Sequence, residues 1–320
     1  MTSQRAGDPV VAWLLEGDPA IRWQVMRDLL DEPADVWRAE QRRTVESGWV
    51  AQLLELQGTD GNWPKGRWTD SLWTLLLLMA LGLPEDHPAP HVPLQRIIGR
   101  LMPPGQPVDR RVLLTRMDLC HLGFWLGLGS TYLAGDPRLP PLAETIVSVQ
   151  LADGGWNCHI RNRPSTTHSS FHTTLNILEN LRLAHERGTV EPGAFITAEG
   201  KAVEFLLAHR LYRSHRTGEV ADHRFPLLTY PWHWHYNALR GMDYLRLTSA
   251  LADERASDGL ALLRSGRRPD GRWPLQSRIP GKLLVEMEKP GRESRWNTLR
   301  ALRILRAADG AGRGPGEDQA

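Results

Sequence analysis

The string QLADGGWN at residues 150–157 decides the fold, because related strings occur at residues 57–64 (QGTDGNWP) and 267–274 (RRPDGRWP). Each contains Asp-Gly, a turn dipeptide in which glycine accepts a positive φ and aspartate bonds to the nearby backbone. A tryptophan lies two residues after each of these glycines. The aspartates of the three strings lie 93 and 117 residues apart, each near twice a helical-repeat period of about 40–50 residues.

Helical patterns lie on both sides of these turns. Residues 46–57 (ESGWVAQLLELQ) have apolar positions at steps of three and four, whereas residues 70–83 (DSLWTLLLLMALGL) are apolar on more than one face. The first pattern predicts a helix that packs on one side, and the second predicts a helix buried within the protein. The chain holds six such pairs, counting one in residues 1–44, and no alternating β pattern. The sequence therefore predicts an all-α fold of outer and inner helices.

The composition indicates which broad class of protein the sequence belongs to. The 320 residues are 41% hydrophobic and 24% charged, with a formal net charge of +2, values typical of a soluble globular protein. So small a net charge gives no indication of a nucleic-acid partner. Two cysteines are too few for a disulfide framework, and the most apolar run, residues 71–83, is too short to span a bilayer. We expect a cytoplasmic protein without a membrane span.

The repeat resembles a known motif. The Gln-x5-Trp spacing at residues 57–63 and 150–156 is similar to the QW repeat of squalene and oxidosqualene cyclases, although Arg267 replaces the glutamine in the third copy. The alternating helix pairs also resemble the β subunit of protein prenyltransferases. Residues 213–220 (RSHRTGEV), 234–246 (WHYNALRGMDYLR) and 293–306 (ESRWNTLRALRILR) are similar to a bacterial group described as prenyltransferase/squalene-oxidase-repeat proteins.

This resemblance covers roughly residues 45–305 and implies a single (α/α)6 toroid, in which inner helices line a central cavity. We expect the toroid to occupy residues 45–307, a helical pair in residues 1–44 to close the ring, and residues 308–320 to form a disordered tail. Squalene-type cyclases are about twice as long, and their Asp-x-Asp-Asp acid motif is absent here, as is the Asp-Asp-x-x-Asp motif of class I synthases. A standard polyprene cyclase is therefore not expected.

The resemblance also implies a zinc site. Prenyltransferase β subunits bind zinc through an acidic-x-Cys pair and a later histidine, a pattern that Asp118, Cys120 and His172 match in MDLC and FHTT. Three protein ligands would leave an open position, as in catalytic zinc sites. In the other interpretation, Cys120 is a small buried side chain and Asp118 a carboxylate at a helix start. Alternative ligands are Cys158, His168 and His233.

A long aromatic loop, residues 221–236 (ADHRFPLLTYPWHWHY), precedes a predicted inner helix. Loops of this length in compact domains are often functional, and aromatic rings suit an apolar or cationic ligand. The alternative is an aromatic plug that packs over the ring. The predicted catalytic residues are His172, His235 and Tyr236, and the predicted aromatic contacts to substrate are Trp125, Tyr230, Trp232 and Trp234.

Basic side chains complete the predicted site. Arg213, His215, Arg216 and Arg240 are the kind of cluster that binds phosphate or diphosphate through charge-assisted hydrogen bonds. They could equally be solvated arginines that pair with nearby carboxylates. Together these patterns predict a metal-dependent enzyme acting on an apolar or prenyl substrate. The alternatives are a metal-free terpenoid cyclase or isomerase, and a non-catalytic toroid that binds lipid or peptide. The oligomeric state stays open.

Overall fold

The computed structural model describes residues 7–311, and within that range it is helical, with isolated bridges between loops but no strand. This confirms the all-α prediction. The α-helices are α2 (Pro9–Leu15), α3 (Pro19–Asp28), α4 (Ala34–Arg42), α5 (Gly48–Glu55), α6 (Ser71–Leu81), α7 (His91–Leu101), α8 (Arg110–Arg116), α9 (Leu119–Tyr132), α10 (Leu139–Val147), α11 (Phe171–Glu186), α12 (Pro192–Ala208), α13 (Ala238–Leu245), α14 (Ser257–Ser265) and α15 (Arg295–Ala311). Short 3-10 helices are η1 (Arg43–Val45), η2 (Cys158–Arg161), η3 (Ser249–Ala252) and η4 (Glu254–Ala256). No helix in this range is both long and apolar enough to cross a membrane.

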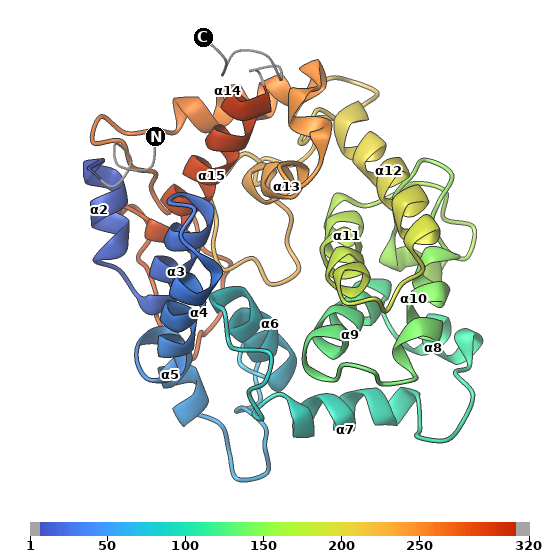
Figure 1. Ribbon diagram of the computed structural model, residues 1–320. Coiled ribbons are helices and arrows are strands. Elements are labelled where there is room, and N and C mark those ends of the chain that lie inside the picture. Colours follow the sequence, from blue (N-terminus) through green and yellow to red (C-terminus); the bar gives the residue numbers. More distant parts are fainter. Residues whose placement is uncertain (1–6, 312–320) are drawn as a thin grey trace.

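Helices that follow one another in alternation along the chain pack against each other, as α6 does with α9, α9 with α11, and α13 with α15. Helix α9 packs between α6 and α11, and α10 covers its outer side. Helix α15 packs against both α13 and α3, so the first and last parts of the described chain meet (Figure 1). The segment expected to be one helical pair, residues 1–44, contains α2, α3 and α4.

The repeat tryptophans connect the helix before each turn to the helix after it. Trp63, Trp156 and Trp273 are buried, and each indole N–H donates to a carbonyl ten residues earlier, at distances of 2.6, 2.9 and 2.7 Å. The backbone N–H of Trp156 donates to Thr174 Oγ1 in α11 at 3.0 Å, and that of Trp273 donates to Thr298 Oγ1 in α15 at the same distance. A buried donor without a partner would cost free energy, so these bonds fix where the next helix begins.

The repeat glutamine has a structural role that accounts for the repeated Gln-x5-Trp spacing in this chain. Gln150 Nε2 donates to Gly154 O at 2.7 Å, which closes the turn, and to Ala198 O at 2.8 Å, which connects the turn to α12. Gly154 has φ +98°, a value that a side chain would strain. Arg267 keeps the first of these bonds, because its Nε donates to Gly271 O at 3.2 Å.

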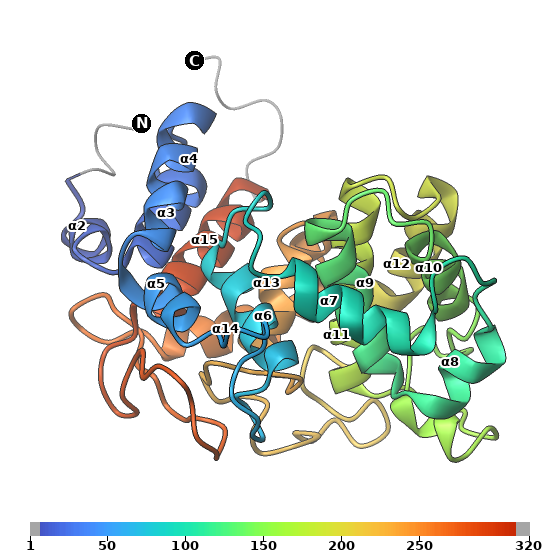
Figure 2. The same cartoon turned by 90° about the horizontal axis from the view of Figure 1, so that it is seen from below.

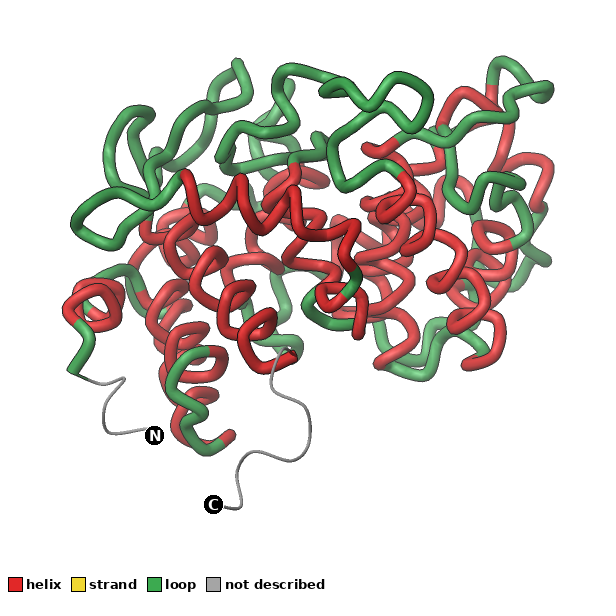
Figure 3. The backbone as a smooth tube through the Cα atoms, turned by 90° about the horizontal axis from the view of Figure 1, so that it is seen from above, coloured by secondary structure: helices red, strands yellow, loops and turns green. Residues whose placement is uncertain are grey.

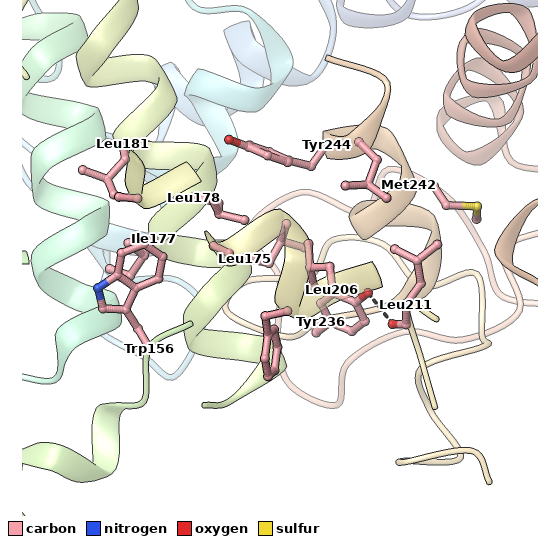
Figure 4. Close-up of a cluster of buried hydrophobic side chains, with 14 of the residues drawn as sticks. Trp156, Leu175, Ile177, Leu178, Leu181, Leu206, Leu211, Tyr236, Met242 and Tyr244 are labelled. Atoms are coloured by element: carbon pink, nitrogen blue, oxygen red, sulfur yellow. Dashed lines mark hydrogen bonds between the residues drawn. The ribbon is translucent and has the colours of Figure 1, made fainter. Parts of the chain in front are cut away.

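The long connections lie together at one end of the helices (Figures 2 and 3), and they include residues 209–237 and 266–294. Apolar side chains fill the space between neighbouring helices below them. In one cluster Trp156 lies beside Ile177 of α11, and Leu206 of α12 and Tyr236 lie at the other side of the same cluster (Figure 4). At the other end of the chain, α15 continues to Ala311, so the first residues of the predicted tail are helical. The remainder, residues 312–320, lies outside the described part of the chain.

Candidate functional site

A central cavity of about 320 Å³ lies between α6, α9, α11, α13 and α15. Residues 230–233 of the aromatic loop also line it. One wall is apolar and comes mainly from α6, with Trp73, Leu76 and Leu77, together with Phe124 of α9. Volumes of about 300–1,000 Å³ are usual for small-molecule sites, and predominantly apolar walls with a few polar groups are typical of them.

The opposite wall is charged. Asp243 of α13 is buried and accepts hydrogen bonds from Arg246 at 2.6 Å, Arg300 at 2.8 Å and Arg303 at 2.6 Å. Burial by itself would raise the pKa of Asp243, but the three guanidinium groups outweigh it and hold that pKa far below its usual range. One carboxylate is therefore the shared ion-pair partner of three arginines. Arg303 has a further partner, because it also bonds to Asp28 of α3 at 3.0 Å.

Arg300 is the least compensated of these cations. Its guanidinium carbon lies 3.8 Å from the centre of the Trp232 ring, a geometry in which the ring face attracts the charge. Its Nε has no hydrogen-bond partner among residues 7–311. Burial lowers the pKa of Arg300 to about 9, and Asp243 opposes that shift only in part. Arg300 also lines the cavity, where an anion would give its guanidinium group a further ion-pair partner.

Arg240, the one predicted basic residue that lines the cavity, is also buried. It bonds to Glu179 at 2.9 Å through Nε and to Asn176 at 2.7 Å, both on α11, and to the carbonyl of His235 at 2.9 Å. Its guanidinium carbon lies 5.2 Å from the Trp232 ring, on which Arg300 also stacks. The ring of Trp232 is therefore shared by two cations.

The other predicted basic residues lie elsewhere. Arg213 donates to Asp258 of α14 at 2.7 Å and to Gly218 O at 3.0 Å, and it is not part of the cavity wall. His215 lies beside His209, with ring centres 5.8 Å apart, and Arg216 is exposed. The charges of residues 213–216 are therefore near one another in sequence without facing the central cavity.

The aromatic residues predicted to contact substrate do not all line the same cavity. Tyr230 and Trp232 line the central cavity, as does His233, whose ring stacks on Trp68 at 4.2 Å. Trp234 instead stacks on His235, with ring centres 3.9 Å apart. Trp125 lines a second, more open pocket of about 890 Å³ that α6, α7 and α9 border.

The three predicted catalytic residues lie together beside the cavity but do not line it. His172 Nδ1 accepts the backbone N–H of Tyr236 at 2.8 Å, and the rings of His172 and His235 are 6.0 Å apart. Burial, followed by the charge of His235, lowers the pKa of His172 to about 4. The buried hydroxyl of Tyr236 donates to Leu211 O (Figure 4), and burial raises its pKa above the usual range. In this arrangement His172 and Tyr236 hold the aromatic loop in place.

The predicted metal ligands are engaged with other groups. Asp118, which precedes α9, forms an ion pair with Arg161 at 3.2 Å. Cys120 and Cys158 adjoin each other, since Cys120 N donates to Cys158 Sγ at 3.3 Å. Among residues 7–311, no three His, Cys, Asp or Glu side chains are grouped so that they could hold a metal ion.

The remaining alternative ligands do not complete a set. His168 is exposed, and its backbone carbonyl accepts from Asn157 at 2.8 Å. His233 lies in the cavity wall against Trp68, and burial lowers its pKa to about 3. The donor arrangement therefore does not fit the zinc site that the resemblance implies, and we derive no chemical step through a metal.

The sequence interpretation missed Asp243, Arg246, Arg300 and Arg303. A signal for them was present, because α15 carries arginines three residues apart in a segment that is otherwise apolar and predicted to be an inner helix. Charged residues on a buried helix are unusual unless they are paired. Comparison with known proteins adds no identification: no family model matches the chain, and no curated protein matches it.

Proposed function

We propose that the chain is a single (α/α)6 toroid and an enzyme that acts on a prenyl diphosphate in its central cavity. The observation that carries this proposal is the buried Arg300 guanidinium, stacked on Trp232 at 3.8 Å with an Nε that lacks a partner among the described residues. The toroid is supported by the packing of α15 against α3 and by a cavity that five of the inner helices border.

The two walls suit the two parts of such a substrate. The diphosphate would lie against Arg300 and Arg240, where guanidinium groups bind phosphate oxygens in pairs. The prenyl chain would lie against Trp73, Leu76 and Phe124, where burial of apolar surface contributes about 25 cal/mol per Å². The cavity volume of about 320 Å³ favours a short prenyl chain.

Ionisation is the reaction that this arrangement supports. The bond between the prenyl carbon and the diphosphate oxygen breaks, and both electrons leave with the diphosphate. Arginines placed where negative charge develops stabilise that step. The aromatic faces of Trp73 and Phe124 would stabilise the allylic cation that remains. That cation then loses a proton or is captured by water with loss of a proton, which gives the neutral prenyl product. Zinc has no part in this proposal, because Asp118 is paired with Arg161 and the predicted donors do not converge.

The proposal is tested with purified protein and geranyl diphosphate. We expect saturable binding by calorimetry, release of inorganic diphosphate, and a prenyl product detected by gas chromatography. Geraniol and inorganic diphosphate, each of which matches one wall only, should bind at least about tenfold more weakly, or by about 1.4 kcal/mol. Equal affinity for geraniol and geranyl diphosphate would favour a binder of neutral lipids instead.

A further inference from the structure

The only two cysteines of the chain, Cys120 and Cys158, come together although 38 positions separate them. Cys120 is the second residue of α9, and Cys158 is the first residue of η2, just after the repeat turn DGGWN. Both are half-buried free thiols. Neither lines the central cavity, so the pair is a separate feature from the proposed substrate site.

Two hydrogen-bond donors are directed at the sulfur of Cys158. The backbone N–H of Cys120 lies 3.3 Å from Cys158 Sγ, and so does the hydroxyl of Thr173 in the first turn of α11. The hydroxyl oxygen of Thr173 also accepts the backbone N–H of Cys158 at 3.3 Å, so its proton is directed toward the sulfur. Donors of this kind stabilise a thiolate more than a thiol.

Helix α9 also stabilises a thiolate at Cys158. The N–H of Cys120 is one of the groups that an α-helix leaves unpaired at its N-terminus, and here the sulfur of Cys158 accepts it. The positive end of the helix dipole stabilises an anion at this position, as it does for other reactive cysteines. Cys158 therefore has a built environment that Cys120 does not share.

We propose that Cys158 and Cys120 form a reactive dithiol, in which Cys158 is the nucleophile toward small hydroperoxides and Cys120 closes the product to an intramolecular disulfide. The half-buried position admits a small oxidant and keeps the second thiol next to the first. Of the two sulfurs, only that of Cys158 accepts from both Thr173 and the start of α9.

Both chemical steps are balanced. The Cys158 thiolate attacks one oxygen of the hydroperoxide, so an S–O bond forms, the O–O bond breaks, and the other oxygen leaves as an alcohol or as water after taking a proton. Cys158 is then a sulfenic acid. The Cys120 thiol attacks that sulfur, the S–S bond forms and the S–O bond breaks, and the hydroxyl leaves as water with the proton of Cys120. The peroxide is reduced by two electrons and the two thiols are oxidised.

The charges around the pair agree with these roles. Hydrogen bonds from the Cys120 thiol and the Thr173 hydroxyl lower the pKa of Cys158, and they outweigh the effect of burial. The same contact and burial raise the pKa of Cys120. Asp118 opposes a thiolate, but it is paired with Arg161 at 3.2 Å and lies 3.9 Å from His121.

Hydrogen peroxide added to the purified full-length protein tests the proposal, because every thiol signal comes from these two residues. Wild type should lose both thiols and two hydrogens in intact mass, without forming a dimer. Cys120→Ser should accumulate a sulfenic acid at Cys158 that dimedone traps, whereas Cys158→Ser should react at least about tenfold more slowly than wild type. Equal rates for the two serine variants, or a disulfide only between molecules, would overturn the proposal.

Thr173 provides a matched pair of variants. Thr173→Ser keeps the hydroxyl and should react with peroxide within about twofold of the wild-type rate, whereas Thr173→Val should slow the reaction several-fold, since a lost hydrogen bond to a charged group is worth a factor of this order or more. Circular dichroism establishes that each variant is folded. If the valine variant is folded and reacts at the wild-type rate, the donor role of Thr173 is wrong.

Discussion

The guanidinium carbon of Arg300 lies 3.8 Å from the centre of the Trp232 ring, and the Nε of the same guanidinium has no partner among residues 7–311. A buried cation is thus held between an aromatic face and a carboxylate, Asp243, that two other arginines share. Such an arrangement is costly in a folded protein unless an anion completes it. We infer that the cavity is built for a ligand whose charge is negative.

Asp243→Asn should destabilise the protein strongly. Removing the carboxylate leaves three guanidinium groups near the cavity without their common partner, and breaking a buried ion pair costs about 3–5 kcal/mol. Urea denaturation at pH 7 measures the loss. Asp258→Asn, which removes the partly exposed partner of Arg213, is the control and should cost less than about 1 kcal/mol.

The stability difference between wild type and Asp243→Asn should also depend on pH. The pKa of Asp243 lies far below its ordinary value of 3.8, since the charges of Arg303, Arg300 and Arg246 outweigh the effect of burial. A lowered carboxyl pKa contributes stability above the unfolded value, and that contribution declines as the pH falls below it. The stability difference between wild type and Asp243→Asn should therefore narrow below about pH 4. A difference that stays constant from pH 6 to pH 3 would contradict this account of Asp243.

His172 predicts a separate loss of stability at mildly acidic pH. Burial and the neighbouring His235 lower its pKa from 6.5 to about 4. Between these two pH values the unfolded chain binds a proton at His172 that the folded chain does not bind. The unfolding free energy should therefore decline as the pH falls from 6.5 to 4, by up to about 1.4 kcal/mol per pH unit. His172→Gln should reduce this slope, and the same change at the exposed His159 should not. Identical slopes for His172→Gln and wild type would count against a neutral, half-buried His172.

Trp156→Phe tests the role of the repeat tryptophans. The variant keeps an aromatic ring but removes the indole N–H that donates to Ile146 O at 2.9 Å. A buried carbonyl that loses its donor costs about 1–3 kcal/mol, and urea denaturation should show a loss in this range. Gln150→Ala, which removes the two bonds to Gly154 O and Ala198 O, should cost a similar amount. Losses below about 0.5 kcal/mol for both variants would mean that the repeat does not act through these bonds.

Metal analysis tests the zinc expectation independently. Because Asp118 is paired with Arg161 and His172 Nδ1 accepts from Tyr236, we expect the purified protein to hold much less than one zinc ion per chain. Its metal content should not change in His172→Ala or Cys120→Ser. One zinc ion per chain that either variant loses would restore the metal-dependent function predicted from the sequence.

Local patterns in the sequence predicted the helices well. The apolar pattern of residues 70–83 predicts a buried helix, and α6 spans Ser71–Leu81 with Asp70 as its N-cap. The repeat turns predicted the boundaries between helices because each turn is defined by neighbouring residues and by one tryptophan. Turns and caps depend on local backbone geometry, which a sequence displays directly.

The charged wall could not be predicted in the same way. Arg213 and Arg216 formed the most obvious basic cluster in the sequence, but Arg213 pairs with Asp258, which lies 45 positions later on α14. Asp243 and Arg300 meet across 57 positions because α13 packs against α15. Which side of each helix faces the cavity depends on that packing, and the arginines of an inner helix reveal only that some partner exists.

Arg300→Gln gives the most direct test of the anion site. The affinity for geranyl diphosphate is measured by calorimetry in wild type, in Arg300→Gln, and in Arg213→Gln, which lies outside the cavity. We predict that Arg300→Gln weakens binding of geranyl diphosphate at least about tenfold, since a charge-assisted hydrogen bond is worth about 1.5–3 kcal/mol. The affinity of Arg300→Gln for geraniol should stay within about twofold of wild type, and so should the affinity of Arg213→Gln for geranyl diphosphate. Loss of binding in Arg213→Gln, with Arg300→Gln unaffected, would contradict the assignment of the central cavity.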